Sequence, residues 1–274
     1  GRRLADDVEL RALTPFYRVR FDDGATFDCT SDPSAMRAEV ARFAPADVEG
    51  YEAFMRASES IYRVGFEQLG HVDFGSWKTM ARIVPEMMRL RGYRSVWGLV
   101  SSFVRDPRLR VVLSFHPLLI GGNPFSATSI YAMIAFLERE YGVHFAVGGT
   151  GRLVEGMARL IRGQGGTLRC NAEVAEIEVS GGRACGVRLA SGERVAADIV
   201  VSNACSAWTY RHLLPGAARH RWTDRRIERS RYSMSLFVWY FGTKLRYESV
   251  PHHTILVGPR YRELLVDIFK RKVL

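Results

Sequence analysis

Few residues in this 274-residue sequence have the types and spacing needed for acid–base, nucleophilic or metal chemistry. His252 and His253 are adjacent, so on a strand their side chains point to opposite faces and cannot readily share one metal ion. His116 lies in an apolar helical segment, which predicts a hydrogen-bonded core histidine, with a cavity-lining role as the alternative. The sequence contains no serine nucleophile elbow, H-E-x-x-H pair or P-loop. This scarcity is compatible with a protein in which a bound cofactor carries the chemistry.

The cysteine spacing and the net charge limit the kinds of site and partner that the sequence predicts. The four cysteines form no C-x-x-C pair, which favours buried thiols in a reducing compartment over a metal site or a disulfide framework. The net charge is +10, and the densest basic run, 219–231, is interrupted by Asp224 and Glu228. That interruption predicts a solvated helix face, with a membrane-facing patch as the alternative and nucleic acid as the least favoured partner. The longest apolar stretches fall short of the roughly 20 residues that span a bilayer.

The segment 147–204 has the clearest order of predicted elements. Gly148-Gly149 opens an amphipathic helix that Gly165-Gly166 ends, and the positive end of this helix could face an anionic cofactor. Strands are expected at 167–170, 172–179, 184–189 and 198–202, with turns at Gly181-Gly182 and Ser191-Gly192. The segment therefore predicts a helix laid against a small sheet.

Elements of mixed type flank that segment. The pattern predicts a hairpin of 16–21 and 26–29, a helix capped by Asp32, and a second helix from Pro45 to about Leu69. Residues 76–141 are expected to be helical throughout, with starts at Pro107 and after Ser126 or Thr128. Strands are expected again at 233–241 and 254–257.

Several long motifs, in order, resemble the bacterial phytoene desaturase family of carotenoid synthesis, and the resemblance covers essentially the whole chain. They read LTPFYRVRFDDGATF (13–27), FAPADVEGYEAFM (43–55), SFHPLLIGGNPFSATSIYAMIAFLERE (114–140), FAVGGTGRLVEGM (145–157), SMSLFVWYFG (233–242) and HHTILVGPRYREL (252–264). The family's G-x-G-x-x-G turn and its Gly-rich C-terminal motif are missing from the sequence. An interior piece of such an enzyme is therefore expected, inactive and colourless by itself.

The resemblance implies a mixed α/β (α+β) fold. Its expected parts are a partial glutathione-reductase-type FAD-binding domain, a β-sheet substrate domain and an inserted helical domain. The corresponding segments are 1–60 and 216–274 for the substrate domain, 61–146 for the helical, membrane-facing domain, and 147–215 for the FAD-binding domain.

The resemblance also implies the reaction and its sites. The family desaturates phytoene, moving hydride from an allylic C–H to flavin N5, and lycopene and neurosporene both remain open as products. FAD would be held at Gly148, Gly149, the backbone of Val174, Asn203 and Ala204. The wall of a substrate tunnel is implied at mostly aromatic positions: Phe115, His116, Leu119, Phe125, Tyr131, Phe237 and Trp239.

The proton acceptor is not evident from the resemblance. Some family members carry an acidic residue in the segment matching 77–82, where this sequence has Lys78-Thr79. Arg82 matches the family and is a candidate to steady a developing charge, with a surface arginine as the alternative. No metal is implied.

The implied partners are a C40 isoprenoid hydrocarbon, the membrane surface and quinone or oxygen as electron acceptor, without nucleic acid. A peripheral location on the cytoplasmic face of the membrane is expected, with residues 87–99 suited to an interfacial helix. The alternatives are another enzyme of the flavin amine-oxidase superfamily (a carotenoid isomerase, a retinol saturase or an amine oxidase) and a non-enzymatic peripheral lipid-binding protein.

Overall fold

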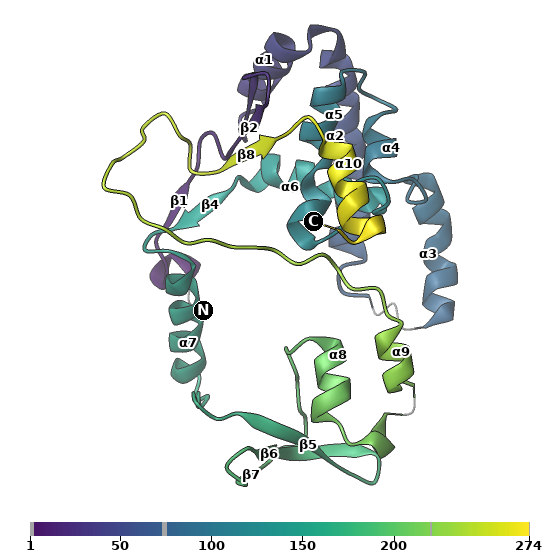
Figure 1. Ribbon diagram of the computed structural model, residues 1–274, viewed down its shortest axis with the longest axis vertical. Helices are drawn as coiled ribbons and strands as arrows, with labels where there is room; N and C mark the ends of the chain where they lie inside the picture. The colour runs from purple at the N-terminus through teal and green to yellow at the C-terminus, as the bar shows by residue number, and fades with distance from the viewer. Residues whose placement is uncertain (1–2, 73–75, 220, 274) are drawn as a thin grey trace. The chain divides into compact units, whose positions relative to one another are not determined.

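The structure, a computed structural model, describes residues 3–72, 76–219 and 221–273 (Figure 1). The chain divides into two units. Unit 1 comprises Gly1–Leu153 with Ser233–Leu274, and unit 2 comprises Val154–Tyr232. The mixed α/β fold class is confirmed, whereas the four predicted domain segments stay predictions.

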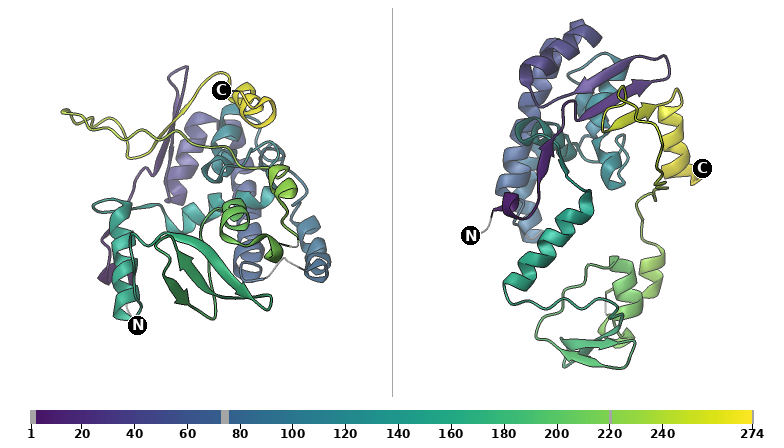
Figure 2. Two further views of the ribbon diagram at one scale, coloured as in Figure 1. Left: turned by 60° about the horizontal axis from the view of Figure 1, so that its bottom comes forward. Right: turned by 90° about the vertical axis from the view of Figure 1, so that its left-hand side faces the viewer.

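A three-stranded sheet in the order β3-β2-β8 forms one layer of unit 1. The hairpin β2 (Tyr17–Phe21) and β3 (Thr26–Cys29) is antiparallel and turns through Gly24, whose φ of +84° suits glycine. β8 (Thr254–Val257) pairs in parallel with β2, so the yellow strand lies beside the purple hairpin (Figure 2). Both predictions, the hairpin and the strand at 254–257, are confirmed.

Helices with sequence-encoded starts cover this sheet. α1 (Pro33–Phe43) begins where the Asp32 carboxylate accepts the backbone N–H groups of its first turn. α2 (Val48–Tyr62) is preceded by a 3-10 turn, Pro45–Asp47, and followed by a π-helical turn, Arg63–Gln68. The predicted helix from Pro45 to about Leu69 is thus confirmed in extent.

Helices in the predicted helical region 76–141 also begin at capping residues. Asp106 caps α5 and Thr128 caps the 3-10 turn that leads into α6. The elements of this region are α3 (Trp77–Arg89), α4 (Val96–Val100), α5 (Pro107–Ser114), the 3-10 turns His116–Ile120 and Ser129–Ala132, and α6 (Met133–Tyr141).

The core of unit 1 lies between the sheet and helices α1, α2, α4, α5 and α6. Its fully buried side chains come from both layers and include Phe27, Phe54, Leu99, Leu109 and Val112. Leu99 therefore belongs to the core. Because α3 ends at Arg89 and α4 begins at Val96, the predicted interfacial helix over 87–99 is wrong. The remaining elements of unit 1 are the 3-10 turn Leu4–Asp6, the antiparallel pair β1 (Leu10–Ala12) and β4 (His144–Ala146), α10 (Tyr261–Val266) and the π-helical turn Asp267–Arg271.

α7 (Thr150–Gly163) runs from unit 1 into unit 2, which is otherwise built on the antiparallel sheet β5-β6-β7. The large buried side chains of unit 2, within the described residues, are Ile177, Leu189 and Ile227. The elements that follow α7 are β5 (Val174–Ser180), β6 (Arg183–Leu189), β7 (Arg194–Ala196), α8 (Ser206–Trp208), a π-helical turn (Thr209–Leu213), a 3-10 turn (Gly216–Ala218) and α9 (Asp224–Glu228).

Several predictions about this second half are wrong. Residues 167–170, 198–202 and 233–241 are all described, yet none of them forms a strand. Val154 and Met157 on the apolar side of α7 are exposed, so the predicted packing of this helix on the sheet is not seen. Apolar periodicity alone does not make a strand, because a strand also needs a hydrogen-bonding neighbour.

The thiols also differ from expectation. Cys29 is buried, but Cys170, Cys185 and Cys205 are exposed. All four are free cysteines, and the three exposed ones lie in unit 2, where few side chains are buried. The thin core of unit 2 explains why these small residues stay in contact with solvent.

Candidate functional site

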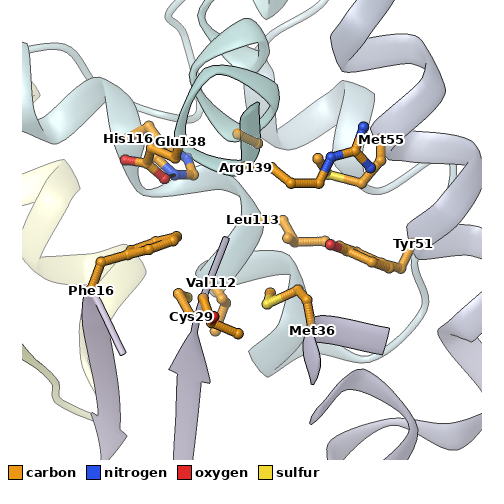
Figure 3. A pocket seen from close by; sticks show the side chains of 12 residues that line it. Phe16, Cys29, Met36, Tyr51, Met55, Val112, Leu113, His116, Glu138 and Arg139 are labelled. Carbon is orange, nitrogen blue, oxygen red and sulfur yellow. Dashed lines mark hydrogen bonds and ion pairs between the residues drawn. The ribbon is translucent and has the colours of Figure 1, made fainter. Parts of the chain in front are cut away.

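A cavity of about 30 Å³ lies inside unit 1, where the ends of β2 and β3 meet four helices. Apolar side chains form most of its wall, and a few polar groups from different elements reach it (Figure 3). It is lined by Phe16, Cys29, Thr30, Met36, Tyr51, Met55, Val112, Leu113, His116, Ala135, Glu138 and Arg139. A mostly apolar space with a few convergent polar groups is the usual form of a small binding or reaction site.

His116 and Glu138 are the central polar pair of this cavity and lie side by side (Figure 3). The His116 Nε2 atom is 3.1 Å from the Glu138 Oε2 atom, and the two residues are only 4% and 7% exposed. The His116 Nδ1 atom is buried and has no hydrogen-bond partner among the residues that the structure describes. If Nε2 carries the proton and donates it to the carboxylate, Nδ1 keeps a free lone pair.

Glu138 contributes to raised pKa values of two neighbouring groups. Burial, together with the charge and hydrogen bonding of Glu138, raises the pKa of Tyr17 well above its usual range. Burial, assisted by the same carboxylate, also raises the pKa of the Cys29 thiol. Both groups are therefore neutral at physiological pH, and the nearby cation among the lining residues is Arg139, beside Glu138 in the chain.

Glu138 was not predicted as a site residue, although the sequence contained a signal for it. α6 carries apolar residues at Met133, Ile134 and Leu137, and Glu138 follows Ile134 by four positions. A carboxylate on the apolar stripe of a helix indicates a buried charge that needs a partner. That the partner is His116, 22 residues earlier, depends on how α5 and α6 pack, which periodicity does not reveal.

The predicted tunnel residues are only partly brought together. Phe115 stacks on His116 with ring centres 4.5 Å apart, and Phe125 packs against Trp97. Tyr131 is half-buried, whereas Leu119 is exposed. Phe237 and Trp239 are 93% and 72% exposed in the segment that was predicted to be a strand. Of the predicted set, His116 alone is among the residues that line the described cavity, so the tunnel stays a prediction.

The predicted FAD residues are divided between the units. Gly148 and Gly149 lie in unit 1 with φ of +86° and +90°, in the turn that starts α7. Val174, Asn203 and Ala204 lie in unit 2. Ala204 lines an open cavity of about 280 Å³ between the β5–β6 face and the segment 206–214.

The residues present fit a flavin nucleotide in two respects. The Gly149 Cβ position is open and its backbone conformation suits glycine, so a ligand can approach the chain closely at the start of a 14-residue helix. Val174 begins β5 directly after residues 169–173, which line an open cavity of about 290 Å³. Backbone groups at such a strand start are accessible to the edge of a nucleotide base.

The remaining residues singled out in the sequence are exposed or partly exposed. Arg82 is an exposed residue on α3. His253 Nδ1 lies 2.9 Å from the Phe16 carbonyl oxygen, and burial, assisted by His253, lowers the pKa of His252. The basic run 219–231 contains the short helix α9, with Arg219 paired to Asp224.

The family of the chain follows from comparison with known proteins. Residues 2–257 match the family described as flavin containing amine oxidoreductase. This is most of the sequence, so the chain belongs to that family. The predicted resemblance is therefore confirmed at the level of the family, and it can be refined.

Within the family, the chain is similar to carotenoid desaturases. It is 48% identical to a neurosporene-forming phytoene desaturase of Cereibacter sphaeroides, over 98% of this chain and 52% of that protein. It is 44% identical to a lycopene-forming phytoene desaturase of Paracoccus sp., over 98% and 54%. It is 33% identical to the all-trans-zeta-carotene desaturase of Myxococcus xanthus, over 96% and 50%. The chain thus spans about half the length of the curated relatives it matches.

Proposed function

We propose that the complete protein containing this chain is an FAD-dependent phytoene desaturase of carotenoid biosynthesis. The observation that carries this proposal is the 48% identity to a phytoene desaturase over 98% of the chain. The scarcity of catalytic side-chain patterns supports it, because in such enzymes the cofactor performs the redox step. Relatives named for neurosporene and for lycopene both match, so both products remain candidates.

The chain's own residues would hold the cofactor and the substrate. When bound, FAD supplies the acceptor for the hydride that leaves an allylic carbon. The turn at Gly148 and Gly149 and the first turn of α7 would face its anionic part, and the backbone of Val174 would bind the adenine edge in a glutathione-reductase-type arrangement. Asn203 and Ala204 would pass close to the cofactor.

A C40 hydrocarbon offers no charge or hydrogen-bonding group. Its binding free energy would come from burial of apolar area, at roughly 25 cal/mol per Å². Phe115, Phe125, Phe237 and Trp239 would supply such a surface in the complete protein.

Membrane association is a second part of the proposal. No helix within the described part of the chain combines the length and apolar content needed to cross a bilayer. α3 exposes Trp77, Met80, Val84 and Met88 on one side, and its exposed cations include Arg82. A helix with this division is suited to lie in the membrane interface. We place the complete protein on the cytoplasmic face of the membrane, with quinone or oxygen as electron acceptor.

The test is desaturation by the complete protein. Purified protein, FAD and phytoene held in liposomes are incubated, and the visible absorption of longer polyenes is followed. Formation of neurosporene or lycopene supports the proposal. Isomerised product with an unchanged number of double bonds would favour a carotenoid isomerase, and a product with fewer would favour a saturase. Lipid binding without bound flavin would favour a non-enzymatic lipid-binding protein.

A further inference from the structure

The His116–Glu138 pair is costly to bury and is not needed to complete any helix or strand. Ionisable groups with 4% and 7% exposure lose most of their hydration, and this loss disfavours the charged form unless partners compensate. The two side chains contact each other at 3.1 Å, while His116 Nδ1 has no partner within the described part of the chain. A purely structural pair would be expected to use both ring nitrogens.

The cavity beside the pair has the size needed for water. Proton transfer is the step of the proposed reaction to which no residue has yet been assigned. A water molecule needs about 10–15 Å³ of accessible volume and two or more polar partners, and the cavity of about 30 Å³ provides both. The same volume is too small for an isoprenoid chain. The space is therefore suited to the passage of a proton through water, not to direct contact with a hydrocarbon.

We propose that His116 is the proton-accepting residue of the desaturation, and that Glu138 is its positioning residue. This inference rests on the proposed function. With FAD bound, a hydride would leave one carbon of the substrate, and the C–H bond pair of the neighbouring carbon would become the second bond of the new alkene. The proton released from that carbon passes to water in the cavity and from there to the imidazole of His116, which lines the cavity together with Glu138. The resulting imidazolium is stabilised by the Glu138 carboxylate.

The groups around the pair leave His116 as the acceptor. Tyr17 from β2, Cys29 from β3 and Tyr51 from α2 all have raised pKa values, chiefly through burial, and stay protonated at neutral pH. Arg139 from α6 is a permanent cation. Glu138 already faces the ring of His116. His116 Nδ1 is the uncommitted basic atom among these facing groups.

The experiment uses the complete protein with FAD and liposome-held phytoene. Since a general base contributes on the order of 100-fold or more, His116→Gln should lower kcat by at least about that factor. The KM for phytoene should stay nearly unchanged, and the acid limb of the pH–rate profile should disappear. Glu138→Gln, which keeps the side-chain volume, should lower kcat and shift that limb. His144→Gln, at an exposed histidine on β4, is the matched control and should leave both unchanged.

A second measurement does not depend on turnover. Nitrogen-edited imidazole spectra of the complete protein should show His116 with the proton on Nε2 and an unprotonated Nδ1 at high pH. The opposite tautomer would overturn the proposal, as would a His116→Gln variant that keeps the wild-type kcat and pH profile. If His116→Gln does not fold, Glu138→Gln and the spectra decide. An active wild type with unaffected variants refutes only this inference, whereas an inactive wild type refutes the proposed function as well.

Discussion

Ser58 should have a larger effect on the stability of unit 1 than its size suggests. Its hydroxyl is fully buried on α2, donates to the Ala132 carbonyl oxygen at 2.6 Å and accepts from the Phe136 backbone N–H at 3.0 Å. Those two backbone groups are four residues apart and would otherwise bond each other directly. The serine therefore inserts into the first turn of α6, the helix that carries Glu138.

The cost of removing this hydroxyl can be worked out from its contacts. Ser58→Ala leaves one buried carbonyl and one buried N–H without their partner, and each unsatisfied group costs about 1–3 kcal/mol. Some relaxation is expected, because the two groups can move toward each other. We therefore expect the free energy of unfolding to fall by roughly 3 kcal/mol. For a unit of this size, that corresponds to a Tm lower by roughly 6–12 °C.

Ser60→Ala is the matched control, since it makes the same substitution on the same helix. Ser60 is exposed and its hydroxyl bonds only the Arg56 carbonyl oxygen within the helix, so its loss should cost less than about 0.5 kcal/mol. Urea unfolding followed by circular dichroism, with the transition of unit 1 fitted separately, compares the two variants. Equal midpoints for the two variants would refute the inserted-hydroxyl argument.

Three further predictions concern the same unit. Asp47→Ala removes a buried carboxylate that accepts two backbone N–H groups ahead of α5, at 2.8 and 2.6 Å. It should lower the free energy of unfolding in urea by about 3 kcal/mol, and Asp47→Asn should lower it less. Burial raises the pKa of Tyr51 to about 12, so its contribution to stability is complete below pH ~10 and is lost as the pH rises toward 12. Tyr51→Phe should therefore reduce the fall of Tm over that interval, and an identical fall would contradict the assignment. Trp77 is 76% exposed, so Trp77→Ser in the complete protein should weaken binding to anionic vesicles by about tenfold or more, measured by sedimentation, with Trp208→Ser in unit 2 as the control.

The parts of the fold that the sequence predicted well are those with local physical signals. Asp32 and Asp106, each followed by proline, mark helix starts because their carboxylates accept the first free N–H groups. The Asp22-Asp23-Gly24 turn marks the hairpin for a similar reason. These features involve residues that are close in sequence. A short segment of the chain therefore includes all the groups that interact.

The errors concern features that depend on distant partners. Residues 198–202 and 233–241 have the apolar pattern of strands, yet Ile199 and Phe237 are among the most exposed large side chains. Strand formation needs a neighbour with matching hydrogen bonds, and no local pattern specifies that neighbour. Leu99 was misplaced for the opposite reason. Its apolar context suits an interface and a core equally, and only the packing of α4 against its neighbours decides.

The chemical roles of the candidate site residues also depend on partners that are distant in sequence. His116 was identified by its residue type and apolar context, but its role depends on a carboxylate brought in by another helix. In the proposed desaturation a hydride and a proton leave the substrate, and FAD would accept only the hydride. A proton acceptor needs a lone pair that is not already committed to a hydrogen bond and a counter-charge that stabilises the protonated form. In unit 1, these two requirements are met by the same pair of side chains, in a cavity with room for water. The residues proposed for the proton transfer therefore all lie in unit 1, whereas the residues proposed for FAD are divided between the two units.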